Sequence, residues 1–399
     1  MTEQSSHIRI LGGGFGGLYT ALRLSQLPWE DGKVPEITLI DQRDRFLFSP
    51  LLYELITQEL QTWEIAPPYA ELLADTNIRF QQARVTGIDL STKQVKLDRH
   101  NPLSYDKLVL ALGGKTPLNI VPGVKEYAIP FRSLEDAYRL EQKLRQLENS
   151  PTDKIRIVIV GGGYSGVELA AKLADRLQKR GRIRIIERGD SILRNSPQFN
   201  QENAKNTLAA KKVWIDLDTA VESVAENSIS LMYKGEVDII PVDIVLWTVG
   251  NQVSELVESL PLVKNQAGFL VTNSHLQTQG HEDIFALGDL ADCTDVNGQK
   301  VPATAQSAFQ QSDYCAWNVW ASLTHRPLLP FRYQNLGEMM ALGQDNATLS
   351  GLGMKLDGTF AYLVRRLIYL YRLPTFKHQL AVGFNWMSTP IMDLLQNEK

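Results

Sequence analysis

A glycine-rich phrase occurs twice in the chain and constrains its fold more than any other feature. It reads ILGGGFGGLYTALRL at residues 10–24 and IVGGGYSGVELAAKL at residues 159–173. Each copy begins with an aliphatic strand pattern and continues with helical periodicity. A further strand pattern follows, at 36–41 or 182–187, and ends on an acid. Each copy therefore predicts a β-α-β unit of the kind that binds dinucleotides.

The glycines of each phrase have the spacing Gly-x-Gly-x-x-Gly. In the first copy, Gly12 allows a tight turn, Gly14 lets a pyrophosphate approach the backbone, and Gly17 lets the helix pack closely on the strand. The pyrophosphate would lie at the helix N-terminus, where unpaired N–H groups and the helix dipole favour an anion. One such motif alone also occurs in turns without a ligand, but two copies in the same context indicate two dinucleotides. The second copy has the same spacing at Gly161, Gly163 and Gly166.

The acid that ends each unit is expected to bind an adenosine ribose. Asp41 and Glu187 lie 24 and 21 residues beyond the last glycine of their motifs. Glu187 would accept hydrogen bonds from both ribose hydroxyls and repel a 2′-phosphate, which favours NADH. Arg188 and Arg194 follow closely, however, and an arginine can hold that phosphate. The pattern therefore leaves both NADH and NADPH open.

We call each glycine motif with its strand, helix and acid a cradle. A flavin and a nicotinamide are the simplest pair of ligands for two cradles, because hydride passes readily between their rings. The segment FALGD ends at Asp289 and follows a predicted strand, so its carboxylate could bind the ribityl hydroxyls of FAD. We expect a helix from about residue 290 onward, with its N-terminus pointing at the flavin. The alternative is that Asp289 only caps that helix. FAD is thus assigned to the first cradle, and NADH or NADPH to the second.

Two further strand patterns, at 105–114 and 242–250, occupy matching places in the two halves, and the chain returns to the first half near residue 278. The predicted fold is α/β, with two Rossmann-like dinucleotide-binding domains, the second inserted in the first, and a C-terminal amphipathic membrane-binding helical tail. The predicted boundaries are 1–120 and 275–330 for the FAD-binding domain, 121–274 for the NAD(P)H-binding domain, and 331–399 for a membrane-association and quinone-site region.

Charge and hydropathy exclude several classes of protein. The 399 residues carry a formal net charge of −4, so no basic field for nucleic acid is expected. The sequence contains no run of 18 apolar residues, so no membrane-spanning helix is predicted. The N-terminus lacks the pattern of a signal peptide. Membrane contact would then be peripheral.

The two cysteines, Cys293 and Cys315, are 22 residues apart and form no CxxC motif. A structural metal site or a disulfide framework is therefore not expected. Disulfide reductases of this plan need two neighbouring cysteines beside the flavin, and the first 292 residues contain none. The expected electron acceptor is a small diffusible oxidant or a protein partner.

The tail has a helical pattern of its own. Residues 355–378 hold five Lys or Arg and one acid, and a short apolar segment follows at 380–395. A basic amphipathic helix with aromatic residues can lie in a membrane interface, but the same pattern suits a helix packed on the protein or on a second subunit. The apolar face of the predicted helix consists of Phe360, Leu363, Val364, Leu367, Ile368 and Tyr371.

Three segments and the tail together resemble the type II NAD(P)H:quinone oxidoreductases, a family of two-dinucleotide flavoproteins, over nearly the whole chain. FLFSPLLYELIT at 46–57 resembles the family's Pro-Leu-Leu-Tyr segment near the flavin. GYSGVELA at 163–170 resembles its second glycine motif. PATAQSAFQQ at 302–311 resembles the Ala-Gln-x-Ala-x-Gln signature at the flavin and quinone pocket. The tail resembles the membrane-anchoring helices of the family.

The resemblance implies that one flavin serves both substrates and that a membrane quinone is reduced to quinol without proton pumping. Gln306 and Gln310 would orient the quinone carbonyls, since uncharged amides suit the place beside an apolar ring. Glu168 would position the nicotinamide or supply a proton. Its alternative role is that of an acid near a helix N-terminus, favoured by the dipole. Glu168, Gln306 and Gln310 are the candidate catalytic residues.

The expected cofactor contacts combine the glycine motifs, the acids and the family segments. For FAD they are Gly12, Gly14, Phe15, Gly16, Gly17, Asp41, Gln42, Pro50, Leu51, Val85, Ala111, Gly113, Asp289, Ala305 and Gln306. For NAD(P)H they are Gly161, Gly163, Tyr164, Ser165, Gly166, Glu168, Glu187, Arg188 and Gly250.

The chain also departs from the family's common pattern. Ala70 stands where many members have an arginine after a similar proline. The stretch 188–204 resembles a cyanobacterial and plastid subgroup associated with naphthoquinone reduction in phylloquinone synthesis, which implies demethylphylloquinone or a related prenyl-naphthoquinone as acceptor. The family also implies a homodimer, bound peripherally on the cytoplasmic side of the plasma or thylakoid membrane.

Other functions stay open at this point. A soluble reductase of a ferredoxin-like or rubredoxin-like protein would need a basic docking face near the flavin, and it gives the apolar tail no task. A sulfide:quinone reductase would need cysteines beside the flavin, and Cys293 and Cys315 are poorly spaced for that. A non-catalytic NAD(P)H redox sensor would show flavin reduction with negligible quinone turnover.

Overall fold

The computed structural model describes residues 6–30 and 34–397, with side chains described as far as residue 388. The chain forms two compact units, each assembled from three segments. Unit 1 consists of Met1–Phe48, Ala66–Lys115 and Asn251–Gln334. Unit 2 consists of Ser49–Ile65, Thr116–Gly250 and Asn335–Lys399.

Unit 1 is built on a five-stranded parallel sheet in the order β17-β7-β1-β2-β3. The aliphatic side chains of its central strands are fully buried, as a parallel sheet requires when both faces are covered. The elements of this layer are β1 His7–Leu11, α1 Phe15–Gln26, β2 Glu36–Asp41, α3 Tyr69–Leu72, β3 Arg79–Gln82, β7 Lys107–Leu110, α8 Glu255–Ser259, β17 Ile284–Ala286 and α9 Ala305–Leu323.

Unit 2 repeats this plan with the parallel order β11-β10-β9-β15-β8. Its elements are α4 Val124–Tyr127, β8 Ala128–Pro130, α5 Leu134–Glu148, β9 Ile155–Val160, α6 Tyr164–Leu177, β10 Gly181–Ile186, α7 Gln198–Ala210, β11 Trp214–Asp216 and β15 Ile244–Trp247. In each unit the strand before the glycine turn, β1 or β9, lies between two parallel neighbours. The two strand patterns that the sequence places in matching positions, now β7 and β15, both pair with that strand.

Each unit also carries a three-stranded antiparallel sheet at the same point of its chain order. In unit 1 it consists of β4 Val85–Asp89, β5 Gln94–Leu97 and β6 His100–Ser104, and it precedes β7. In unit 2 it consists of β12 Thr219–Ala225, β13 Ser228–Tyr233 and β14 Glu236–Pro241, and it precedes β15. The duplication therefore extends from the glycine turn through the whole Rossmann-like framework.

The boundaries differ from the predicted ones. Residues 251–274 were expected in the second domain but belong to unit 1, because Val257, Leu260, Leu262 and Leu270 are buried in its core. The short parallel pair β16 Leu270–Val271 and β18 Ala291–Asp292 ties the same segment to unit 1.

Two further segments belong to unit 2 against expectation. Residues 49–65 were expected in the FAD-binding domain, but they form η1 Ser49–Leu55 and α2 Thr62–Ile65 in unit 2. The tail is part of unit 2 as well and not a region by itself. It begins with an antiparallel sheet of β19 Glu338–Ala341, β20 Ala347–Gly351 and β21 Met354–Asp357.

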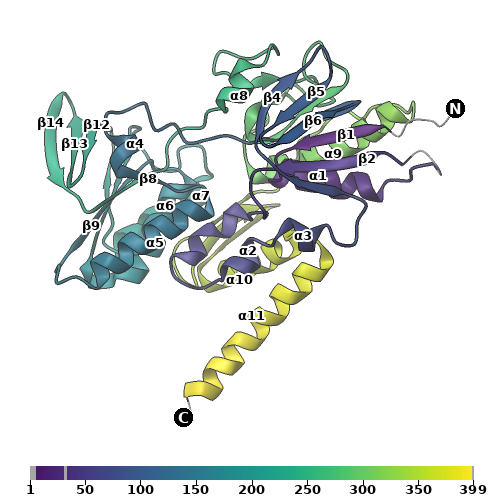
Figure 1. The fold of residues 1–399 in the computed structure, drawn as a ribbon. Coiled ribbons are helices and arrows are strands. Elements are labelled where there is room, and N and C mark those ends of the chain that lie inside the picture. Colours follow the sequence, from purple (N-terminus) through teal and green to yellow (C-terminus); the bar gives the residue numbers. More distant parts are fainter. Residues whose placement is uncertain (1–5, 31–33, 398–399) are drawn as a thin grey trace. The chain divides into compact units, whose positions relative to one another are not determined.

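The predicted tail helix is divided into two, α10 Gly358–Arg372 and α11 Phe376–Asn397 (Figure 1). The break lies at Leu373 and Pro374, because the residue before a proline is driven out of the helical region; Leu373 has φ −59° and ψ 146°. α10 packs on the tail sheet through Ala361 and Tyr362, which join Ala347 and Leu349 in a small core. Within the described part of the chain, none of the helices combines the length and apolar character needed to cross a bilayer.

Candidate dinucleotide sites and the buried charge network

The two glycine turns have the same geometry. Gly12 has φ +97° and Gly161 has φ +110°, a backbone conformation that favours glycine. A Cβ on Gly17 would overlap the carbonyl oxygen of Gly12, and a Cβ on Gly166 would overlap that of Gly161. The first and third glycines of each motif are therefore required by the turn and by helix packing.

The second glycine of each motif faces open space. Among the described residues, no heavy atom lies within 4 Å of a Cβ position on Gly14 or on Gly163. These glycines are the N-cap residues of α1 and α6, and no described side chain caps either helix. Each helix thus presents its free N–H groups to a space that a phosphate can fill. Both cradles fit a dinucleotide pyrophosphate.

Each ribose-binding candidate is fastened to its own glycine turn in the same way. Asp41 accepts hydrogen bonds from the N–H of Gly13 at 2.6 Å and of Arg43 at 2.8 Å. Glu187 accepts from the N–H of Gly162 and of Gly189, both at 2.7 Å. Because each carboxylate oxygen has a second lone pair, both acids can still accept a ribose hydroxyl.

The other residues expected near FAD fall into both units. Phe15 and Gly16 begin α1, Gln42 follows Asp41, and Val85 begins β4. Ala111 and Gly113 follow β7, and Gly113 has φ +67°. All of these lie in unit 1, as do Asp289, Ala305 and Gln306, whereas Pro50 and Leu51 lie in η1 of unit 2.

The helix expected directly after Asp289 is not present. The described chain has a single 3-10 turn there, η3 Gly288–Leu290, followed by β18, and its next helix is α9, which begins at Ala305. The loop before α9 is held by Asp295, whose Oδ1 accepts hydrogen bonds from the backbone N–H groups of Asn297 and Gln299, both at 2.9 Å. The turn itself is held by Gln311, whose Oε1 accepts from the N–H of Gly288 at 2.9 Å. Gln311 is a positioning residue that the sequence reasoning missed.

The two candidate glutamines of α9 have different surroundings. Gln310 donates from Nε2 to the carbonyl of Gln334 at 2.8 Å and accepts from the N–H of Gln334 at 3.0 Å. Both ends of its amide are thus used by the backbone, which favours a structural role over contact with quinone. Gln306 accepts from the hydroxyl of Tyr333 at 3.2 Å. Of the two, Gln306 is the stronger candidate for orienting a substrate.

The second cradle opens into a pocket of about 590 Å³ in unit 2. Four expected residues, Gly163, Tyr164, Glu187 and Arg188, line it, together with residues of the loop that follows β10. Ser165 lies just beyond Tyr164 in α6 and accepts a hydrogen bond from Tyr53 at 2.8 Å. Gly250 has φ +86° and packs against Pro117, so its glycine is required by the turn.

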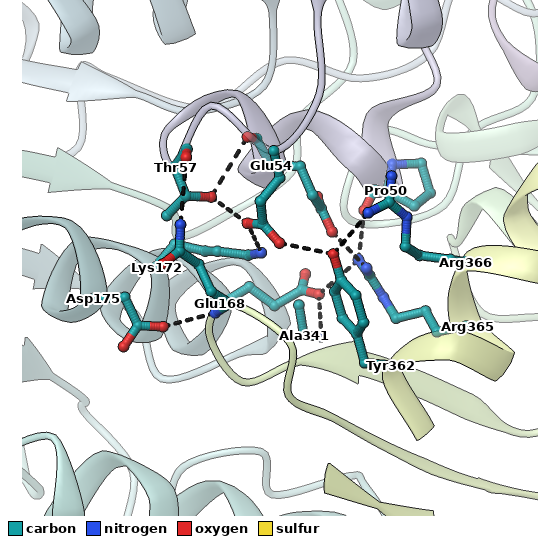
Figure 2. A network of polar contacts seen from close by, with 12 residues as sticks. Pro50, Glu54, Thr57, Glu168, Lys172, Asp175, Ala341, Tyr362, Arg365 and Arg366 are labelled. Carbon is teal, nitrogen blue, oxygen red and sulfur yellow. Dashed lines mark hydrogen bonds and ion pairs between the residues drawn. The ribbon is translucent and has the colours of Figure 1, made fainter. Parts of the chain in front are cut away.

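Glu168, the third candidate catalytic residue, lies in the second turn of α6 and is 6% exposed. The alternative role of Glu168, that of an acid near the helix N-terminus favoured by the dipole, has little support here, because the first turn of α6 contains no acid. Its Oε1 accepts from the N–H of Ala341 at 2.8 Å and from Nη2 of Arg365 at 3.4 Å (Figure 2). Glu168 thus joins α6 to the tail sheet and to α10.

Arg365 is fully buried and contacts both Glu54 and Glu168 (Figure 2). Its Nη1 donates to Glu54 Oε1 at 2.5 Å, and its Nη2 donates to the carbonyl of Pro50 at 2.9 Å. The guanidinium also lies 4.8 Å from the centroid of the Tyr369 ring. Arg365 therefore holds η1 against α10.

A second cation, Lys172, lies one helical turn beyond Glu168 and is also fully buried. It pairs with Glu59, which in turn accepts from the hydroxyl of Tyr362 at 2.9 Å. We call Glu54, Glu59, Glu168, Lys172 and Arg365 the buried charge network. It contains three carboxylates and two cations, so one carboxylate has no cation of its own.

The pKa values of the two acids on Arg365 move in opposite directions. Burial raises the pKa of Glu168 to about 7, and the attraction of Arg365 only partly offsets it. Burial acts in the same sense on Glu54, but Arg365 and Lys172 outweigh it and hold the pKa of that carboxyl below its usual range. The short pair with Arg365 explains the difference. Of the two acids on Arg365, Glu168 is the one whose raised pKa suits it to take up a proton near neutral pH.

Only Glu168, of the five residues in this network, is indicated by the sequence pattern. Lys172 could have been predicted from its spacing, because residues four apart on a helix share a face and Lys172 therefore lies on the same face as Glu168. The sequence gives no sign that Glu54 and Arg365 pair, apart from the fact that both are charged residues in apolar segments. They lie 311 residues apart in the chain.

The tail helices bury one side and expose the other. On α10 the exposed side chains include Phe360, Leu363, Leu367 and Tyr371, with Leu367 64% exposed. The opposite face buries Arg365 together with Ala361 and Tyr362. α11 continues the apolar surface with Phe376, Leu380, Phe384 and Met387. We call these eight side chains the apolar tail surface.

The tail is also fastened by a second buried acid, Glu64 of α2. Its carboxylate accepts from Trp386 Nε1 at 2.7 Å and from Asn385 Nδ2 at 3.2 Å, and its carbonyl contacts His378 Nε2 at 2.8 Å. Arg366 stacks on the Trp386 ring at 4.1 Å. The segment 49–65 therefore holds α10 through Glu54 and α11 through Glu64.

Both cysteines are free and buried in unit 1. Burial raises the pKa of Cys315 to about 12 and that of Cys293 above its usual range. Because the thiolate is the reactive form, neither cysteine is suited to thiol exchange or to persulfide chemistry.

Comparison with known proteins agrees with this architecture. Residues 6–312 match the model of the pyridine nucleotide-disulphide oxidoreductase family. Demethylphylloquinone reductase NdbB of Synechocystis sp. is 59% identical over 402 residues, which cover 100% of each chain. The alternative NAD(P)H-ubiquinone oxidoreductase C1 of Arabidopsis thaliana is 42% identical over 96% of this chain and 81% of the relative.

Among solved structures, NDH2 from Plasmodium falciparum in complex with NADH has the same fold, with a TM-score of 0.86 at 21% identity over 97% of this chain and 98% of that one. Sulfide:quinone oxidoreductase from Aquifex aeolicus shares the fold with a TM-score of 0.79 at 21% identity over 92% and 90%. The fold alone is shared by several classes of flavoprotein reductase. The family match and the two relatives that align over nearly the whole chain identify the family more closely. The chain belongs to the type II NAD(P)H:quinone oxidoreductases, within the pyridine nucleotide-disulphide oxidoreductase family.

Proposed function

We propose that this protein is an FAD-dependent NAD(P)H:quinone oxidoreductase that does not pump protons. The observation that carries the proposal is the pair of matched cradles, each with an open second glycine, an uncapped helix N-terminus and an acid fastened to the turn. The first cradle would hold FAD and the second NADH or NADPH. Two buried, unreactive cysteines make a thiol acceptor a poor alternative.

The proposed acceptor is a prenyl-naphthoquinone such as demethylphylloquinone. Its support is the name of the relative that is 59% identical over the whole chain. The relative that is 42% identical is named for ubiquinone, so a benzoquinone is the competing acceptor. Gln306, whose amide is held by Tyr333, is the residue we assign to orient the quinone carbonyl.

Bound FAD would supply a two-electron carrier between nicotinamide and quinone. The N–H groups at the start of α1 and α6 would bind the two pyrophosphates, and Asp41 and Glu187 would fix the adenosine riboses. Reduction of a quinone to a quinol also consumes two protons. Glu168 can hold one of them on its carboxylate at neutral pH, because its pKa is raised to about 7.

The apolar tail surface supports a place at a membrane. Eight apolar side chains on α10 and α11 face solvent, and Arg366 and Arg372 belong to the same helix pair. Such a surface fits a lipid interface from which a long-chain quinone can enter. We propose peripheral binding on the cytoplasmic side of the plasma or thylakoid membrane, and a homodimer as the assembly.

Steady-state oxidation of NADH and NADPH by the purified flavoprotein tests the proposal. The acceptors to compare are a short-chain naphthoquinone, a benzoquinone and ferricyanide. Quinone turnover that is faster with the naphthoquinone is the expected result. Ferricyanide reduction without quinone turnover would instead indicate a protein acceptor or a sensor and would overturn the proposal.

A further inference from the structure

The proton that Glu168 gives up to a substrate has to be replaced from solvent. Oxidation of NAD(P)H by a quinone takes up one proton per turnover, because the nicotinamide gives one hydride and the quinol gains two hydrogens. A site that holds its substrates excludes water, so a buried donor is refilled from a side that faces away from them. Glu168 projects from α6 and is buried against β19 and α10, so the route has to pass between these elements.

The two groups that donate hydrogen bonds to Glu168 cannot carry that proton. One is the backbone N–H of Ala341, and the other is Arg365, which stays protonated wherever the protein is folded. The pKa of Glu54 is held low despite its burial, because Arg365 and Lys172 attract the carboxylate, so Glu54 holds no proton either. Burial also raises the pKa of each tyrosine near the Glu168 carboxylate, so these phenols release protons less readily than usual. They are Tyr53, Tyr164 and Tyr369.

Among the described groups that act on the Glu168 carboxylate, Lys172 remains. It lies one turn further along α6, at the spacing at which glutamate and lysine side chains meet on one helix face. Its ammonium has three N–H groups and is fully buried, and its one hydrogen bond within the described structure goes to Glu59. Because burying an ammonium costs free energy, packing alone gives no reason for a lysine at this position.

Glu59 links Lys172 to the surface, since its side chain is partly exposed. One carboxylate oxygen accepts from the ammonium of Lys172 and from the hydroxyl of Thr57. The other accepts from the hydroxyl of Tyr362 at 2.9 Å. The backbone N–H of Glu59 donates to the carbonyl of Glu54 at 3.0 Å, which fixes the loop after η1. Glu59 is therefore held against the buried ammonium while its side chain stays accessible to solvent.

We propose that Glu59 and Lys172 form the path by which protons from solvent reach Glu168. Solvent protonates the carboxylate of Glu59, Lys172 releases an ammonium proton to the carboxylate of Glu168, and Glu59 then returns a proton to the lysine nitrogen. Each cycle moves one proton inward and leaves Glu59 and Lys172 in their starting states, so no further reactant is needed. Neither residue is assigned a contact with a substrate. The inference rests on the proposed function, in which Glu168 supplies a proton to the quinone.

The arrival of protons at Glu168 can be measured in the FAD-loaded protein without any turnover. A caged proton released by light lowers the pH through neutrality, and time-resolved infrared spectroscopy follows the carboxylic acid band that is missing in Glu168→Gln. In Glu59→Gln we expect this band to rise about tenfold more slowly than in the native protein. Glu59→Asp keeps a carboxylate and should regain much of the rate. Lys172→Arg should also be slow, because arginine keeps the charge and the ion pair but does not release its proton.

Steady-state turnover gives a second readout. In Glu59→Gln and Lys172→Arg, kcat with a naphthoquinone should fall about tenfold with little change in KM, because proton supply and not quinone binding is impaired. Ferricyanide takes up no proton and should be reduced at the native rate. Glu148→Gln is the matched control, since it removes an acid from the ion pair with Arg176 near the other end of α6, and it should change neither rate.

The outcomes separate a proton path from a structural ion pair. A native rate of protonation in Glu59→Gln or in folded Lys172→Arg would overturn the path, and so would an equal loss of quinone and ferricyanide turnover. Glu59→Gln and Glu59→Asp decide the matter if Lys172→Arg does not fold. A native protein that reduced no quinone would refute the proposed function, while the infrared measurement would still decide whether protons reach Glu168 by this route.

Discussion

At the scale of single residues, the chemistry of unit 2 depends on how one guanidinium is shared. Arg365 lies 2.5 Å from an oxygen of Glu54 and 3.4 Å from one of Glu168, so its charge mainly compensates Glu54. Glu168 is left with a backbone N–H and a raised pKa of about 7. An acid in this state can release and regain a proton at physiological pH.

Replacing Glu168 by Gln should remove that proton source while keeping the hydrogen bond to Ala341. We expect quinone turnover to fall by about two orders of magnitude, with flavin reduction by NAD(P)H largely retained. In the native protein turnover should decline as the pH rises through about 7, because Glu168 then loses its proton. Stopped-flow reduction and steady-state pH profiles measure the two steps. A variant with the native pH profile would exclude Glu168 as the donor.

The same group makes stability depend on pH with a definite sign. Because the pKa of Glu168 is higher in the folded protein than its ordinary value of 4.5, folding favours proton uptake. The resulting stabilisation is fully present below about pH 4.5 and is lost as the pH rises through about 7. Thermal unfolding of Glu168→Gln should lack this decline between pH 5 and 7, compared with the native protein in the same buffers.

Arg365 and Glu54 should behave as a pair in unfolding experiments. Replacing Arg365 by Met leaves the buried carboxylate of Glu54 uncompensated, so we expect a loss of about 3–5 kcal/mol in the free energy of unfolding. The double variant Arg365→Met/Glu54→Gln should regain much of that loss, and Arg365→Lys should be milder than Arg365→Met. Denaturant unfolding of these variants and of the single variant Glu54→Gln gives the interaction energy. Simple addition of two independent losses would show that the pair does not act as one.

At the scale of elements, the local sequence pattern predicted many of the helices and strands. It did not predict which face of each element is buried or against what. The strand, turn and helix of each cradle follow from residues that are neighbours in sequence. The pattern of α10 defines an apolar and a polar face, yet it does not determine which face is buried. In the structure Arg365 points inward and the apolar residues point outward, because η1 supplies Glu54 and Pro50 as partners. No local signal reveals partners that lie more than 300 residues away.

The apolar tail surface can be tested without disturbing the buried face of the tail. Leu367→Gln/Phe384→Gln changes two side chains that are 64% and 70% exposed, so the free energy of unfolding should hardly change. Partitioning onto vesicles that contain anionic lipid should fall more than tenfold, because each apolar side chain contributes about 1.5–3 kcal/mol when buried. Ile239→Gln on β14 is the control, since Ile239 is also exposed, at 67%, but lies outside the tail. Equal binding by all variants would exclude the tail as the membrane contact.

At the scale of the whole molecule, the chain contains two copies of one dinucleotide-binding plan. The sequence repeat predicted the glycine turns, both acids and the strands β7 and β15. It did not predict the composition of the units, because residues 49–65 and 251–274 are placed by side chains such as Glu54 and Leu270 that pack far from their sequence neighbours. For the same reason the buried charge network, which joins three segments of unit 2, had to be seen in the structure.

The duplication makes a paired prediction, because equivalent glycines should affect different ligands. Gly14→Ala and Gly163→Ala each place a Cβ in space that no described atom occupies, so both variants should fold. Gly14→Ala should purify with little FAD and still bind 5′-AMP, whereas Gly163→Ala should keep its FAD and lose affinity for 5′-AMP. Flavin content and calorimetry distinguish the two.

Gly17→Ala is the control for this pair. Its Cβ would overlap the carbonyl of Gly12, so the turn itself must shift, and the free energy of unfolding should fall whether or not a ligand is present. If Gly14→Ala lost FAD and 5′-AMP together, the two cradles would not be independent sites. If Gly163→Ala lost FAD instead of 5′-AMP, the assignment of the cofactors to the two cradles would be reversed. The crossed pattern is expected because each cradle is closed by its own helix, strand and acid, all contained in one unit.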